Sequence, residues 1–388
     1  MTDCIPFANT ARDCQTLQKF FPESGVVRTT GEALAKFSKQ LHEYKVWADA
    51  GVDGLERWPD ISDTFRIYIS SWAHQDRIGD TDFQKSPDRV KVTEFVISAL
   101  NQLCMTSHPD WLSVPQLPCV SGSGRNKINR QLANATGAWQ QRNRFKGRLV
   151  LPFIVTHVSQ IKLKQERNKK VDLLCDCLEE SGANALWVVD RSLNDLGGAS
   201  SVKEYRLKAV IELHEQIRDR LPGDLTVVAG PYWGLNLILW CRGLVQHPAI
   251  GLGNAFQYHS PGGYVQSAKS RIAINALKRL AVASSSLQTW LQDTLKAISK
   301  SDPAFAEMAF LLKSFPHLQI DGRNQVASTY AQWVRRLEQL PSSGRALALY
   351  QDFSSAYVFG RPLNLMPLDE GSARRPERIA EQLMMHCL

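Results

Sequence analysis

The stretch Leu149-Val150-Leu151-Pro152-Phe153-Ile154-Val155 is an uninterrupted apolar run of strand length. A second run, Ala185-Leu186-Trp187-Val188-Val189-Asp190, is apolar up to its last residue, and residues 165–181 between the two runs have a helical pattern. Strands that are apolar on both faces are typical of parallel sheets, whose outer face is covered by helices. This part of the chain therefore predicts a strand, a helix and a second, parallel strand.

The same alternation extends in both directions along nearly the whole chain of 388 residues. Strands are predicted at residues 26–29, 65–72, 111–117, 149–156, 185–190, 225–230, 250–256 and 346–352. Helices are predicted between them, at residues 31–48, 90–103, 126–141, 165–181, 202–221, 235–245, 271–282, 287–298, 303–315 and 327–340. Eight alternating units predict an α/β fold, a (β/α)8 TIM-like barrel, as a single domain over residues 1–388.

Two segments depart from the strand and helix rhythm. Residues 265–340 are predicted to be a helical insertion before the last strand, and residues 369–388 a C-terminal tail with a short helix. The alternative fold is an open doubly wound sheet. No Gly-x-Gly-x-x-Gly motif follows any predicted strand, so a dinucleotide-binding half of that kind has little support.

Composition indicates an ordinary soluble globular protein, with 44% hydrophobic and 22% charged residues. There is no run of 18 apolar residues, and the first ten residues have neither the basic nor the apolar region of a secretory signal. A membrane span is therefore not expected. The eight cysteines lie mostly alone in apolar segments, which favours reduced thiols and a cytoplasmic location.

Positive charge is concentrated in one part of the chain. Residues 121–170 carry one acidic residue and a net charge of +11, so the remaining residues carry −3 of the total of +8. The basic residues are Arg125, Lys127, Arg130, Arg142, Arg144, Lys146, Arg148, Lys162, Lys164, Arg167, Lys169 and Lys170. Such a block attracts polyanions, and Trp139 and Phe145 within it could stack on unpaired bases. The alternative is that the charges line the solvated faces of two helices, with both rings in the core.

Candidate site residues follow the predicted strands, because barrel active sites lie at the carboxyl ends of the strands. We predict Asp190, Asp352 and His259 as catalytic acid or base groups, Asp190 because it ends an apolar strand and would be partly desolvated. The predicted substrate-binding residues are Gln116, His157, Arg191, Tyr232, Trp233, Asn254, Gln257 and Tyr258. Tyr232 and Trp233 lie in a Gly-Pro-Tyr-Trp-Gly loop that could present both rings as a stacking wall.

No metal site and no cofactor is predicted. Cys175 and Cys177 lie two residues apart in a helical pattern, where they point to different faces, and no second ligand pair accompanies them. Nucleophile, P-loop and kinase motifs are absent.

Two strand ends resemble those of the queuine- and archaeosine-type tRNA-guanine transglycosylases and their DNA-modifying relatives. Trp187-Val188-Val189-Asp190-Arg191-Ser192 is similar to the strand end where that family carries a base-recognising Asp beside a Ser. Residues 226–230, the following helix and residues 251–256 are similar to its later strand, helix and strand unit. The resemblance implies a barrel that acts on nucleic-acid bases. Two departures stand against base exchange: Asn254 occupies the region of the family's nucleophilic Asp, and its zinc-binding cysteines and histidine have no counterpart.

Three hypotheses follow. The first is a nucleic-acid-binding barrel that modifies bases in tRNA or DNA, with a transglycosylase-like activity. The second is a catalytically inactive nucleic-acid-binding or scaffolding subunit, with a protein partner in a larger modification or host-defence complex. The third is a barrel enzyme that acts on a small anionic metabolite.

Overall fold

The computed structural model describes residues 3–49, 89–119, 123–156, 159–190, 193, 204–253, 270–364 and 377–388 of the protein. Parallel strands within these ranges form a closed barrel, in which each strand pairs with the next along the chain and β8 pairs with β1. The strands are β1 (Ile5–Phe7), β2 (Val26–Thr30), β3 (Lys45–Asp49), β4 (Trp111–Ser113), β5 (Arg148–Val155), β6 (Ala185–Asp190), β7 (Thr226–Ala229) and β8 (His247–Gly251). The predicted (β/α)8 barrel is confirmed, and an open sheet is excluded.

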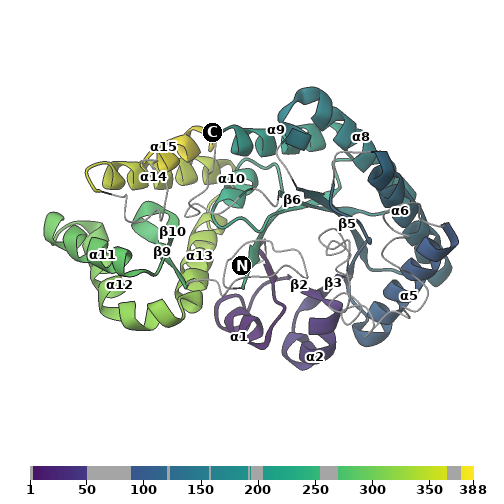
Figure 1. The fold of residues 1–388 in the computed structure, drawn as a ribbon, viewed down its shortest axis with the longest axis horizontal. Coiled ribbons are helices and arrows are strands. Elements are labelled where there is room, and N and C mark those ends of the chain that lie inside the picture. Colours follow the sequence, from purple (N-terminus) through teal and green to yellow (C-terminus); the bar gives the residue numbers. More distant parts are fainter. Residues whose placement is uncertain are drawn as a thin grey trace.

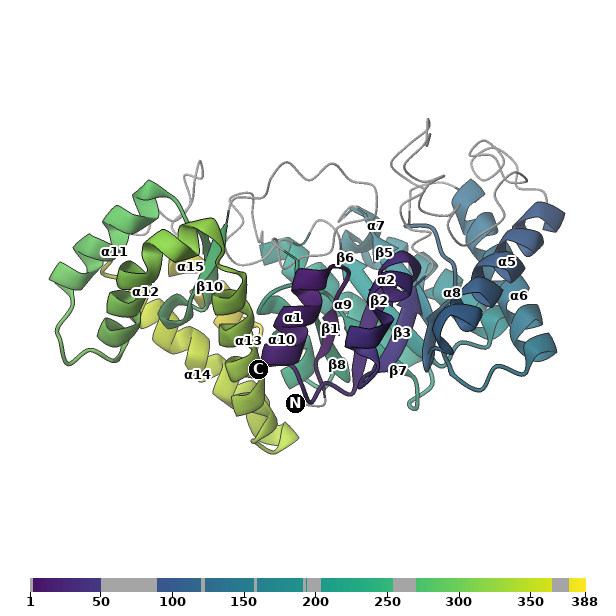
Figure 2. The ribbon, with the colours of Figure 1, turned by 90° about the horizontal axis from the view of Figure 1, so that it is seen from below.

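Helices surround the barrel, as Figure 1 shows in a view along its axis. They are α1 (Ala11–Phe20), α2 (Gly31–Leu41), α5 (Arg89–Ser107), α6 (Ser123–Asn143), α7 (Ser159–Lys162), α8 (Lys164–Ser181), α9 (Glu204–Arg220) and α10 (Leu235–Cys241). In the side view of Figure 2 the strands and the outer helices run roughly upright. Among the described helices we find none with the length and hydropathy that a membrane crossing requires.

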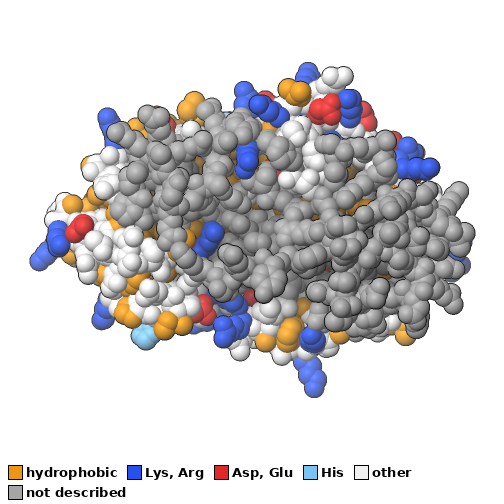
Figure 3. All heavy atoms as spheres, viewed as in Figure 1, with side chains coloured by type: hydrophobic (Ala, Val, Ile, Leu, Met, Phe, Trp, Pro, Cys, Tyr) orange, Lys and Arg blue, Asp and Glu red, His pale blue; other side chains and the backbone are white. Residues whose placement is uncertain are grey.

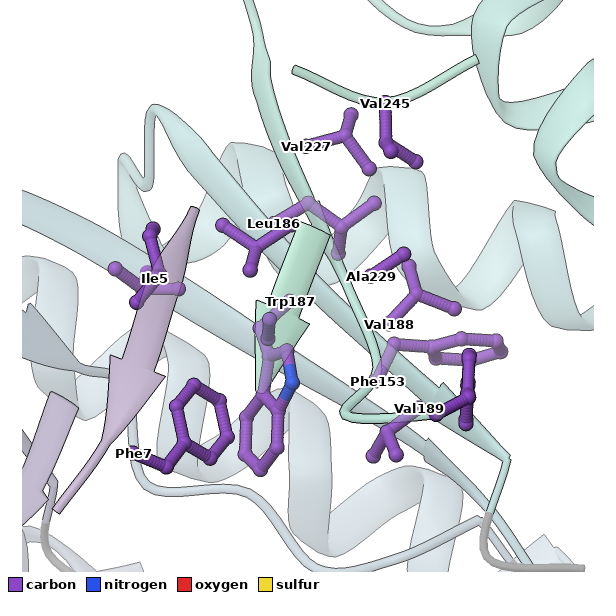
Figure 4. Packing of buried hydrophobic residues seen from close by; sticks show 14 of the residues in the cluster. Ile5, Phe7, Phe153, Leu186, Trp187, Val188, Val189, Val227, Ala229 and Val245 are labelled. Carbon is purple, nitrogen blue, oxygen red and sulfur yellow. The ribbon is translucent and has the colours of Figure 1, made fainter. Parts of the chain in front are cut away.

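Aromatic side chains fill the interior of the barrel. Phe7 pairs in register with Arg28, and Arg28 with Trp47, so the three side chains point to the same face of the sheet. The Trp187 ring lies 5.5 Å from the Phe7 ring and 5.7 Å from the Trp47 ring, centroid to centroid. Figure 4 shows Phe7 and Trp187 side by side, projecting from β1 and β6. Burial of these rings adds to the hydrophobic stabilisation of the barrel.

A second group of elements follows β8, at the left of Figure 1, and its residues 272–318 pack around a core of their own. It consists of β9 (Arg271–Ile274), the 3-10 helix η3 (Asn275–Leu277), β10 (Arg279–Val282), α11 (Ser285–Ala297), α12 (Pro303–Ile320), α13 (Arg323–Glu338), α14 (Ser342–Gly360) and α15 (Glu377–Met385). The predicted helical segment therefore comes after the last barrel strand, because that strand is β8.

Helix α13 joins this second group to the barrel. The Tyr330 hydroxyl donates to Asn236 Oδ1 on α10 at 3.2 Å, and Arg323 forms an ion pair of 3.1 Å with Asp13 on α1. Several α13 side chains, including Tyr330, also belong to the buried cluster that fills the barrel. The two groups thus share one continuous set of packed side chains.

Two predicted elements have the wrong secondary structure. Residues 346–352 are not a strand but part of α14, whose buried residues Leu349, Phe353, Ala356 and Gly360 recur every three or four positions. The run is rich in Ala and Leu, which favour helix over strand. Residues 271–282, predicted as a helix, form the β9–β10 hairpin, whose turn contains Lys278 with φ +50°.

Other differences concern short strands. β1 has three residues and was not predicted, and β3 lies at the end of the region predicted as the helix 31–48. β8 begins three residues earlier than predicted. The predicted strand 65–72 lies outside the described residues.

His214 on α9 makes the stability of the fold dependent on pH. Its ring is fully buried, and burial lowers its pKa from 6.5 to about 4 although Nδ1 contacts the Val210 carbonyl oxygen at 2.8 Å. Between these two pH values the unfolded chain binds a proton at His214 and the folded chain does not. The unfolding free energy therefore falls as the pH drops from 6.5 to about 4.

We predict that, between pH 7 and pH 4, the unfolding free energy of His214→Leu falls by about 3 kcal/mol less than that of the wild type. Urea denaturation at the two pH values measures the difference. His42→Gln is the control, because the His42 side chain is exposed. An identical pH dependence in wild type and His214→Leu would contradict the prediction.

Candidate functional site

The carboxyl ends of the barrel strands contain a buried ion pair. Arg28 on β2 and Asp49, the last residue of β3, form an ion pair between Nη2 and Oδ2, with side chains 4% and 6% exposed. Arg28 pairs in register with Trp47, and Asp49 lies two residues after Trp47 on β3. All three side chains therefore point to the same face of the sheet, into the barrel. Parallel barrels bind ligands at this end of the strands.

Aromatic rings enclose the guanidinium group of Arg28. Its central carbon lies 4.3 Å from the Trp187 ring centroid, 4.5 Å from that of Phe7 and 5.6 Å from that of Trp47. Cation–π contacts of this kind strengthen when water is excluded. They also hold the plane of the guanidinium in one orientation.

Hydrogen bonds from the two indole groups position the rings. Trp47 Nε1 donates to Ser113 Oγ on β4 at 2.9 Å, and Trp187 Nε1 donates to the Gly230 carbonyl oxygen at 2.7 Å. Neither Arg28 nor Asp49 was predicted from the sequence as a site residue. The available signal was a single Arg inside the run Val26-Val27-Arg28-Thr29-Thr30, where a charge must be buried if the run is a barrel strand.

Asp190 does not face this ion pair. Side chains alternate along a strand, so Asp190 lies on the face of β6 opposite to Trp187 and Val189. Its backbone N–H donates to the Tyr232 hydroxyl oxygen at 2.6 Å. Burial raises the pKa of Tyr232 well above its usual range, and the Asp190 carboxylate adds to this rise, so the hydroxyl stays protonated.

Tyr232 and Trp233 do not form an open stacking wall. Both rings are almost completely buried, and Trp233 packs 5.7 Å from Trp333 and 6.1 Å from Tyr330 on α13. The second group of helices covers the loop that carries them, which the local sequence could not reveal. A base could not stack on either ring without displacing this core.

Asp352 is not at the end of a barrel strand. It lies on α14, where its carboxylate accepts hydrogen bonds from Trp333 Nε1 at 2.7 Å and from Arg336, with Lys278 Nζ 4.0 Å away. Burial lowers the pKa of Lys278, and the Asp352 carboxylate opposes that change. The role of Asp352 in this arrangement is to hold helices together.

Gln116 also has a structural partner. Its amide donates to the Asn129 carbonyl oxygen at 2.9 Å, and Asn129 in turn exchanges two hydrogen bonds with the Leu117 backbone. These bonds attach the segment after β4 to α6. The predicted site residues His157, Arg191, Asn254, Gln257, Tyr258 and His259 lie outside the described residues. Within the described ranges, no three His, Cys, Asp or Glu side chains are arranged to hold a metal ion.

Part of the basic block is neutralised by acids from neighbouring helices. Arg130 on α6 forms ion pairs with Glu180 and Asp176 on α8, at 2.7 and 3.4 Å. Arg167 pairs with Glu212 on α9 at 2.7 Å, and its Nη1 also donates to two backbone carbonyl groups. Asp176 and Glu180 lie on α8 after residue 170, where the basic block of residues 121–170 ends.

Further members of the block are bound within the molecule. Lys169 pairs with Glu166 at 2.8 Å, and Arg148 lies 4.9 Å from the Trp111 ring. Lys170 is buried. Trp139 is buried as well, so its ring is not available to stack on a base, and the partly buried Phe145 packs 5.6 Å from it. Arg125 belongs to α6, but its side chain lies outside the described set.

The exposed remainder of the block consists of Lys127, Arg142, Arg144, Lys146, Lys162 and Lys164. Among the described residues, all of these except Lys162 make no ion pair. Between α6 and α8 lies a groove of about 620 Å³, which is lined by both signs of charge: Lys127, Arg130 and Lys169 against Asp172, Asp176 and Glu180. In Figure 3, blue and red side chains are likewise interspersed along the upper margin.

Asp352 supports a prediction about stability. Asp352→Asn should lower the unfolding free energy by about 2 kcal/mol, because it leaves Arg336 and the half-buried Lys278 without their carboxylate. Urea denaturation measures the change. Asp293→Asn, which removes an exposed pair with Lys296, should change stability by less than about 0.5 kcal/mol. Equal effects of the two substitutions would show that Asp352 has no structural role.

Comparison with known proteins adds little to these observations. The chain matches no known family and no curated protein. The carboxyl transferase domain of Rhizobium etli pyruvate carboxylase, solved with 3-bromopyruvate, is 11% identical over 99% of this chain, with a TM-score of 0.39. The chain spans 60% of that structure's length. The enoyl reductase domain of MlnA from the macrolactin biosynthesis cluster of Bacillus amyloliquefaciens is 11% identical over 99% of this chain and 93% of its own, with a TM-score of 0.28. Likenesses at this level carry no functional information.

Proposed function

We propose that this barrel protein binds nucleic acid along α6, the segment between α6 and β5, and the beginning of α8. The observation that supports the proposal is the set of exposed cations Lys127, Arg142, Arg144, Lys146 and Lys164, which make no ion pair within the described residues. Each remains hydrated and able to contact a phosphate group, with release of condensed counterions.

The spacing of these cations fits an extended polyanion better than a small one. Lys127 lies near the first turn of α6 and Arg142 in its last turn. Fifteen residues of helix separate them by about 22 Å. A nucleic-acid duplex presents about a dozen phosphates over that length, so one duplex could contact both ends of the helix.

A binding role has more support than base modification. Asp190 is directed away from the barrel interior, Asp352 is bound to Trp333 and Arg336, and Tyr232 and Trp233 are core residues. The proposal is therefore a nucleic-acid-binding or scaffolding subunit, without a transglycosylase-like reaction assigned to these residues. All eight cysteines are free thiols, which supports a cytoplasmic location.

Salt dependence tests the proposal. Binding to a 20-nucleotide RNA duplex and to the DNA duplex of the same sequence is measured by fluorescence anisotropy at several salt concentrations. For five phosphate contacts, log K should fall against log salt with a slope of about −4.5, an affinity loss of about 500-fold between 50 and 200 mM salt. No binding at low salt, or binding independent of salt, would overturn the proposal.

The footprint is tested by a triple substitution. Arg142→Gln, Arg144→Gln and Lys146→Gln together should reduce the steepness of the salt slope by about 3. The matched control replaces Lys296, Lys300 and Lys313, exposed on the second group of helices, with Gln. If both triple variants bind with the same slope, the contact surface is not on α6.

A further inference from the structure

The Arg28 guanidinium is more completely enclosed than a structural ion pair requires. Rings from three strands, β1, β3 and β6, contact it, and the whole residue is 3% exposed. Ring contacts shield the faces of the planar group but leave its hydrogen-bond donors, which point outward in the plane. The donors of Arg28 are therefore held in fixed directions.

One of these donors has no acceptor. Asp49 accepts from Nη2, whereas the buried Nε of Arg28 has no hydrogen-bond partner in the part of the chain that the structure describes. Buried polar groups are nearly always hydrogen-bonded, because an unmade bond in the interior costs free energy. The buried Nε–H of Arg28 is therefore a donor that an oxygen atom of a ligand can satisfy.

The location of the pair agrees with a binding site. Arg28 extends from the middle of β2 toward Asp49, the residue at the carboxyl end of β3, which is the end of parallel barrels that binds ligands. Arg presents its Nε and Nη groups as a fork that matches the two oxygens of a carboxylate or phosphate. Phe7, Trp47 and Trp187 make the surroundings of this donor apolar.

We propose that Arg28 is the anchor of a second site, inside the carboxyl end of the barrel, which binds the oxyanion group of a small molecule. The oxyanion is a carboxylate or a phosphate, one oxygen of which accepts a hydrogen bond from the Nε of Arg28. Asp49 sets the guanidinium in place and, as a neighbouring negative charge, limits the affinity for a second anion. The site is separate from the exposed cations of α6 and does not depend on their binding nucleic acid.

Two probes test the site: inorganic phosphate, and benzoate as a carboxylate on a flat apolar body. Each is titrated at constant ionic strength, with the thermal unfolding midpoint and the tryptophan fluorescence as readouts. We expect a saturable response to at least one probe. A response to phosphate alone assigns a phosphate ligand, and a response to benzoate alone assigns a carboxylate. Absence of a saturable response to both overturns the proposal.

Two variants assign the response to Arg28. Arg28→Gln combined with Asp49→Asn replaces the ion pair by neutral side chains and leaves no uncompensated charge, and Arg28→Lys keeps the charge but lacks Nε. Each should weaken probe binding about tenfold or more. The second variant keeps the test valid if the first does not fold. A response that persists unchanged in a folded variant overturns the proposal.

A third variant separates this site from the proposed nucleic-acid surface. The triple substitution of Arg142, Arg144 and Lys146 should bind phosphate or benzoate as wild type does while its duplex binding weakens. Loss of the small-anion response in that variant would place the anion on the surface of α6 and overturn the assignment to Arg28.

Discussion

The arrangement of the barrel interior depends on one cation. A guanidinium cannot be buried without a countercharge and hydrogen-bond acceptors, and Arg28 obtains its countercharge from Asp49 on the adjacent strand. Phe7, Trp47 and Trp187 surround it from three strands. A change of register by one residue in any of these strands would turn its side chain to the helix-facing side of the sheet.

The indole hydrogen bonds extend this constraint to two more strands. Trp47 is bonded to Ser113 on β4, and Trp187 to Gly230, directly after β7. Residues from most of the barrel thus contribute to the position of one charged group. This network also explains why the carboxyl end of the barrel holds a polar centre within an otherwise aromatic interior.

The charged residues on the outer helices differ from the buried Arg28 in their exposure to solvent and in their pairing. Arg130 is paired with Glu180 of the neighbouring helix α8, whereas Lys127 and Arg142 on α6 and Lys164 on α8 are exposed. Exposed pairs of this kind contribute little to stability. A count of charge along the sequence therefore overstated the free positive surface, because the acids that neutralise it follow later on α8 or lie on α9.

Local sequence determined the parts of the fold that have a strong pattern. The long apolar strands β5 and β6 and the helix between them follow from residues 149–190, which were sufficient to indicate a parallel strand–helix–strand unit. Short strands such as β1 lack a pattern that separates strand from helix. The helical spacing of residues 346–352 becomes visible only together with the residues that follow them on α14. Only the tertiary structure decided which polar residues meet. The side on which Asp190 points depends on the register set by Trp187, the burial of Trp233 depends on α13, and the pairing of Arg28 with Asp49 depends on closure of the barrel. The physical reason is that hydrophobic patterning is a property of neighbouring residues, whereas ion pairs and ring contacts join residues that only folding brings together.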